Sequence, residues 1–130
     1  MDFIELILTS LELVAEQVED LTEPVYEHYY SESPESRGLM DHMDLLMCGR
    51  MLNEVITLLV MPDEDLQVTL KFEVKTHASN GVQLEMYGQF FNAIYVVVRD
   101  TLGQKWTPEF DTAWQQRIDF LNKEIATAVG

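Results

Sequence analysis

The sequence has 130 residues, enough for one domain with a single hydrophobic core, so we treat residues 1–130 as one domain. The 23 Asp and Glu against eight Lys and Arg give a formal net charge of −15, which argues against nucleic acid and anionic membranes as partners. Cys48 is the sole cysteine, so the chain has no internal disulfide, which fits a reducing compartment. The acidic start Met1–Glu5 lacks the basic residues of a secretion signal, and no apolar run reaches the roughly 18 residues of a membrane span. We therefore expect a soluble cytoplasmic protein.

The first half of the chain is predicted to form two long amphipathic helices with a short one between them. Residues 3–21 carry apolar side chains at helical spacing: Phe3, Ile4, Ile7, Leu11, Val14, Val18 and Leu21. A short helix is predicted from about Glu23 to Tyr30, and Ser31–Pro34 then breaks the chain and starts a turn that ends near Gly38. The next long helix has its apolar stripe at Leu45, Leu46, Gly49, Leu52, Val55, Ile56 and Leu59.

The second half is also predicted to be helical. Pro62 and the acidic residues 63–65 mark the start of a helix that ends after His77, where Ser79-Asn80-Gly81 permits a left-handed turn. The next helix is predicted over Gln83–Leu102, because the helical spacing of apolar residues over 20 positions and the stop at Gly103 outweigh the β-branched run Tyr95–Val98. Thr107 and Pro108 are typical of a helix start, and the last helix follows with its stripe at Phe110, Ala113, Trp114, Arg117, Leu121 and Ile125. We expect an all-α protein whose last two helices pack antiparallel.

His77 is the residue that most needs a chemical interpretation. Leu66, Leu70 and Val74 share a sector of about 80° with His77, which puts the imidazole on the buried face of its helix. Most histidines in such places pack in the core with one hydrogen bond, and a smaller share bind a metal. The residues alone leave both interpretations open.

Several segments, in order, resemble the bacterial single-domain globins and the globin domains of flavohaemoglobins. His77-Ala78-Ser79-Asn80-Gly81-Val82 is similar to their haem-ligating histidine and the turn after it. The last two helices of these globins resemble four segments here: Tyr87, Leu102-Gly103, Trp106-Thr107-Pro108-Glu109 and Ala113-Trp114. Their first helices and the corner after them resemble Leu11–Ala15, Val25–Tyr30 and Pro34–Met40. The resemblance covers essentially the whole chain.

This resemblance implies a globin fold of about six to eight helices around a haem pocket. It implies that His77 ligates the iron of haem b and that Tyr26, a strong hydrogen-bond donor, lies on the distal side. The other residues that it places around the cofactor are Met40, Cys48, Leu52, Val74, Val82 and Tyr87. Cys48 is also interpretable as a small buried apolar residue, which is the commoner role of such a cysteine. His28 and His42 are expected at the surface.

Three functions are consistent with this pattern. The first is a protein that binds dioxygen or another diatomic gas, NO or CO, at the iron, and the second is a nitric oxide dioxygenase that depends on a separate reductase. The third is a haemless sensor or interaction module, suggested by Met40 where relatives have phenylalanine and by Cys48 where they have glutamine or histidine. We favour gas binding over an autonomous enzyme. A homodimer is compatible with each of these functions.

Overall fold

The computed structural model describes residues 2–39, 44–78 and 84–129, with the backbone alone for residues 39, 73–78, 84, 85 and 129. All elements in these ranges are helical, which confirms the all-α prediction. They are α1 (Phe3–Gln17), α2 (Thr22–Glu32), α3 (Pro34–Leu39), α4 (Leu45–Val60), α5 (Asp63–Ala78), α6 (Leu84–Leu102), the short 3₁₀-helix η1 (Gly103–Lys105) and α7 (Pro108–Val129). The run Tyr95–Val98 lies inside α6, as expected from the helical spacing. Within the described ranges, no helix is long and apolar enough to cross a bilayer.

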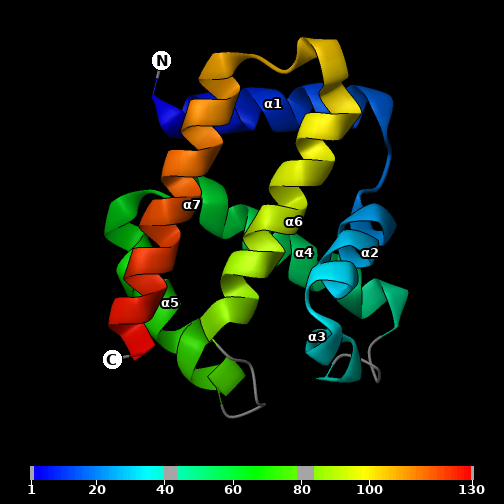
Figure 1. Ribbon diagram of the computed structural model, residues 1–130. Helices are drawn as coiled ribbons and strands as arrows, with labels where there is room; N and C mark the ends of the chain where they lie inside the picture. Colours follow the sequence, from blue (N-terminus) through cyan, green and yellow to red (C-terminus); the bar gives the residue numbers. More distant parts are fainter. Residues whose placement is uncertain (1, 40–43, 79–83, 130) are drawn as a thin grey trace.

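The long helices α6 and α7 lie side by side and antiparallel, as predicted, and η1 joins them (Figure 1). α1 crosses both of them near this connection, α2 packs against α6, and α5 packs against α7. α4 lies behind the pair and contacts α1, α2 and α7. The core therefore sits between the α6–α7 pair and the helices that cross it.

The connection between α6 and α7 follows from its local sequence. Gly103 has a φ of +54°, in the left-handed region that glycine adopts most readily, so α6 ends there. The Thr107 hydroxyl oxygen accepts a hydrogen bond from the backbone N–H of Phe110 at 3.1 Å, and Pro108 opens the helix. The predicted helix start at Thr107–Pro108 is confirmed.

The apolar stripe predicted for α7 is confirmed. All six predicted stripe residues of α7 are buried: Phe110, Ala113, Trp114, Arg117, Leu121 and Ile125. Trp114 is completely buried, and its indole N–H donates to the Ser10 hydroxyl of α1 at 2.8 Å. Ser10, which the apolar pattern did not include, is thus a buried member of the α1 face.

Two predictions about α1 and α4 are wrong in detail. Leu45 and Leu46 were expected on the buried stripe of α4, yet they are 56% and 68% exposed, because they border an open groove that no other described element covers. Phe3, the first residue of α1, is 40% exposed, and α1 ends at Gln17, before Val18 and Leu21, which were predicted to continue its stripe. The short second helix is longer than expected, since it runs to Glu32 before Pro34 begins α3.

Candidate functional site

Tyr26 lies in the core, on the face of α2 that packs against α6. Its side chain is only 5% exposed. The ring makes an edge contact with Phe90 of α6 at a centroid distance of 5.3 Å, and Tyr29 and Tyr30 lie 6.4 and 5.7 Å away on α2 itself. Tyr26, Tyr29 and Tyr30 follow the i, i+3, i+4 spacing of one helix face. This aromatic cluster holds the Tyr26 ring in place.

The Tyr26 hydroxyl reaches the neighbouring helix α4. It donates a hydrogen bond to the backbone carbonyl oxygen of Cys48 at an oxygen–oxygen distance of 3.2 Å. Burial is the main cause that raises the pKa of the Tyr26 phenol well above its ordinary value, so the hydroxyl keeps its proton at neutral pH. The structure therefore brings together two residues that the family resemblance placed on one side of the pocket.

Cys48 and Leu52 occupy consecutive turns of α4 and both are buried, at 8% and 3% exposure. The helix begins just before them, where the Asp44 carboxylate accepts the backbone N–H of Met47 at 2.9 Å. Burial raises the pKa of the Cys48 thiol, so the sulfur stays protonated near neutral pH. The expected burial of Cys48 is confirmed, and its position beside the cofactor stays a prediction.

α5 carries the predicted iron ligand. Leu66 and Leu70 are 0% and 1% exposed, which confirms the first half of the predicted inward stripe. The backbone of α5 remains helical through His77 and ends at Ala78, as expected. The side chains of Val74 and His77 lie outside the described residues, as do all of Met40, Val82 and the Ser79–Gly81 turn.

The remaining candidates take varied positions. Tyr87, in the second turn of α6, is half-buried and packs against the hydrophobic core. His28 is half-buried rather than fully exposed, and its Nε2 lies 3.7 Å from a Glu32 carboxylate oxygen. His42 is outside the described residues. In the described part of the chain, no three His, Cys, Asp or Glu side chains gather in a way that could hold a metal ion.

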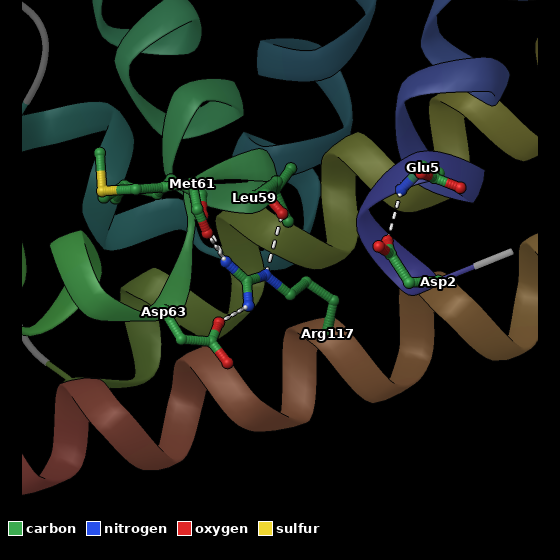
Figure 2. A network of polar contacts seen from close by, with 7 residues as sticks. Asp2, Glu5, Leu59, Met61, Asp63 and Arg117 are labelled. Atoms are coloured by element: carbon green, nitrogen blue, oxygen red, sulfur yellow. Dashed lines mark hydrogen bonds and ion pairs between the residues drawn. The ribbon is translucent and has the colours of Figure 1, made fainter.

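Arg117 is a buried residue whose role the apolar pattern did not reveal. Although only 5% exposed, its guanidinium donates to the carbonyl oxygens of Leu59 at 2.9 Å and Met61 at 2.6 Å (Figure 2). It also donates to the Leu58 carbonyl at 3.3 Å and to the Asp63 carboxylate at 2.8 Å. These carbonyls are at the C-terminal end of α4 and in the corner after it, and Asp63 begins α5. The signal in the sequence was an arginine on an otherwise apolar stripe.

Arg117 therefore fixes the corner between two helices that matter for the site. α4 carries Cys48 and Leu52, and α5 carries His77. Only Met61 and Pro62 connect these helices, and the Arg117 side chain from α7 bonds to groups on both sides of this connection. The guanidinium satisfies carbonyl groups that the end of α4 leaves without helical partners.

The arrangement matches a known family. The Globin family matches residues 27–125, about three quarters of the chain, and this region contains α3–α6, the second half of α2 and all but the last four residues of α7. A search of curated proteins finds no match for the chain. The all-helical fold agrees with the family match. We conclude that the chain belongs to the globin family, whose members typically bind haem.

Proposed function

We propose that this globin binds one haem b through the imidazole of His77 and takes up dioxygen, NO or CO on the opposite side, next to Tyr26. The observation that carries this proposal is the burial of Leu66 and Leu70, the described part of the predicted inward stripe of α5. Leu66 and Leu70 face the core, and His77 follows Leu70 by seven residues, close to two helical turns. Helical periodicity gives a residue at this spacing the same face as Leu70, and a histidine on the core-facing side of a helix meets the first requirement of a haem ligand.

The residues of the pocket suit this cofactor chemically. When bound, haem iron supplies the coordination position that a diatomic gas occupies. Tyr26 is a protonated phenol that can donate a hydrogen bond to a polar gas molecule, and Leu52, one turn beyond Cys48 on α4, adds a buried apolar side chain. Cys48 stays a neutral thiol and adds no charge to the pocket. We assign Met40, Val74 and Val82 to contacts with the porphyrin, and Tyr87 to the surroundings of His77.

Titration of the purified protein with haemin tests the proposal. We expect saturation at one haem per chain, with a Soret band that shifts on reduction and again on addition of CO. The pyridine haemochrome spectrum should identify haem b. Haemin that fails to saturate, or that is removed completely by a short gel-filtration step, would contradict the proposal.

One observation favours a second function, a haemless sensor or interaction module. The Tyr26 hydroxyl already has an acceptor in the Cys48 carbonyl, so this buried polar group needs no cofactor or gas to satisfy it. Under this alternative, the protein purified without haem would be fully folded and would not gain thermal stability from haemin. Under the primary proposal haemin raises the unfolding temperature, because the cofactor binds only the folded state.

A further inference from the structure

An open groove lies on the side of α4 that faces α1. Its volume is about 930 Å³, and it runs between α1, the α1–α2 connection and the first three turns of α4. Most of the lining is apolar: Leu11, Val14, Ala15, Val18, Leu21, Leu45, Leu46, Leu52 and Ile56. The polar residues in the lining are Glu19, Asp20, Thr22, Arg50 and Asn53.

Two leucines in the wall of this groove are exposed to an unusual degree. Leu45 is 56% exposed and Leu46 is 68% exposed, and Met47 beside them is 41% exposed. Adjacent large apolar side chains left in water at the edge of an apolar groove are typical of a protein interaction site. In the described part of the chain, no element covers them.

The acidic residues in and beside the lining restrict what could cover this groove. The first 36 residues contain no Lys or Arg, and Glu12, Glu16, Glu19 and Asp20 are exposed in or just after α1. The Thr22 hydroxyl and backbone N–H donate to the Asp20 carboxylate and lower its pKa, so this group stays ionised. Arg50 is the one cationic side chain in the lining, on the α4 side. With a net charge of −15, the chain repels a second copy of itself, nucleic acid and anionic lipid.

We propose that the groove binds an amphipathic, basic helix of a partner protein. The apolar face of this helix would cover Leu45 and Leu46, and its Lys or Arg residues would face Glu19 and Asp20 in the α1–α2 connection. A helix laid in an apolar groove is a common mode of peptide recognition, and complementary charge fixes its orientation. The inference does not rest on haem binding: of the groove residues only Leu52 is also assigned to the cofactor, and the variants that test the groove leave Leu52 unchanged.

A designed peptide provides the test. The probe is a fluorescent helix of about 18 leucine and lysine residues with leucine at helical spacing, and the control peptide has the same composition in scrambled order. Fluorescence anisotropy with the full chain should show at least about tenfold tighter binding of the amphipathic peptide. NMR shift changes on titration should fall on α1 and the start of α4.

Matched variants separate the groove from general attraction. Leu45→Gln with Leu46→Gln should weaken binding about tenfold or more, because it removes the apolar contact without changing charge. Val68→Gln with Phe72→Gln removes two side chains of similar exposure on α5, 75% and 72%, and should change binding less than about twofold. A second double variant, Glu16→Gln with Glu19→Gln, should weaken peptide binding and make the affinity less dependent on salt. The control double variant on α7, Glu109→Gln with Asp119→Asn, should have a smaller effect on both quantities. All these side chains are exposed or half-exposed, so circular dichroism should confirm unchanged folding.

Three results would overturn the proposal. Equal binding of the scrambled peptide would mean that diffuse charge attraction explains the affinity. Unchanged affinity in the Leu45/Leu46 variant would exclude the groove as the site. Concentration-dependent dimerisation that the Leu45/Leu46 variant abolishes would identify a second copy of the chain as the occupant.

Discussion

The Tyr26 hydroxyl and the Cys48 carbonyl oxygen lie 3.2 Å apart and join α2 to α4 by a buried hydrogen bond. A phenol has a single proton to donate. A gas molecule that accepts this proton must therefore compete with the Cys48 carbonyl. Because the ring is held by Phe90 and Tyr29, we expect the competition to involve rotation of the hydroxyl hydrogen rather than movement of the whole side chain.

This competition sets the expected effect of Tyr26→Phe on dioxygen release. A hydrogen bond to a partly charged acceptor contributes about 1.5–3 kcal/mol and a neutral one about 1, so the net contribution is about 0.5–2 kcal/mol. Release of dioxygen should become about 2- to 30-fold faster, as measured by stopped-flow displacement with CO. Release of CO, which carries little charge when bound, should change much less.

Tyr29→Phe provides the control for this experiment. Tyr29 belongs to the same aromatic cluster, but its hydroxyl accepts a hydrogen bond from Ser36 of α3 and does not reach α4. Removal of the Tyr29 hydroxyl should leave the release rates of dioxygen and CO nearly unchanged. Equal shifts of dioxygen and CO in Tyr26→Phe would indicate an altered pocket shape, and the hydrogen-bond role of Tyr26 would be wrong.

Arg117→Met should strongly destabilise the fold. The substitution retains much of the buried volume but leaves the Leu59 and Met61 carbonyls without their donor, at a cost of about 1–3 kcal/mol for each buried group. We expect a loss of about 2–4 kcal/mol in the free energy of unfolding, measured by urea denaturation.

The ion pair of Arg117 should contribute far less than its bonds to the carbonyls. The Asp63 side chain is 67% exposed, and exposed pairs contribute about 0–1 kcal/mol. Asp63→Asn should therefore cost less than about 1 kcal/mol. If Arg117→Met and Asp63→Asn lower the free energy of unfolding equally, the ion pair stabilises the corner, and the proposal that the bonds to the Leu59 and Met61 carbonyls stabilise it is wrong.

Ser10→Ala should destabilise the contact between α1 and α7. The Ser10 hydroxyl accepts the N–H of Trp114 and itself donates to the Ile7 carbonyl, so its removal leaves a fully buried indole N–H without an acceptor. The expected cost is about 1–3 kcal/mol in urea denaturation. Thr9→Ala is the neighbouring control, because the Thr9 hydroxyl bonds only to the Glu5 carbonyl in an exposed part of α1. A cost no larger than that of Thr9→Ala would show that the Trp114 bond is not stabilising.

Stability should fall at alkaline pH through Cys48 and Tyr26. Burial raises the pKa of both groups from ordinary values of 9.0 and 10.0, so above about pH 9 the unfolded chain loses these protons before the folded chain does. The folded state is then penalised as pH rises. Cys48→Ala should reduce the loss of stability between about pH 8 and pH 10, measured as the change in urea midpoint. An identical loss in the wild type and in Cys48→Ala would show that the thiol does not contribute.

The helices were predictable because each one is specified locally. The stripe of α7 and the Thr107–Pro108 start depend on residues within a few turns of each other, and the structure confirms them. The exposure of Leu45 and Leu46 was not predictable in this way. Periodicity shows that one face of α4 is apolar, whereas the coverage of that face depends on how far α1 lies from α4.

The candidate site depended even more on long-range contacts. Tyr26 and Cys48 are 22 residues apart, and only the family resemblance placed them on one side of a pocket. The function of Arg117 was hidden because its acceptors are backbone carbonyls 56 to 59 positions away, and every residue type has such a carbonyl. A spacing pattern within one helix contains no information about these partners.

Replacement of the proposed iron ligand tests the central claim most directly. His77→Gly should abolish stable haem binding, and added free imidazole should restore a haem spectrum close to that of the wild type, because the small molecule replaces the lost side chain. His28→Gly is unsuitable as a control inside α2, so His28→Ala should be used, and it should bind haem normally. If His77→Gly retains the wild-type ferric and ferrous spectra without imidazole, His77 does not ligate the iron and the proposed function of this pocket is wrong.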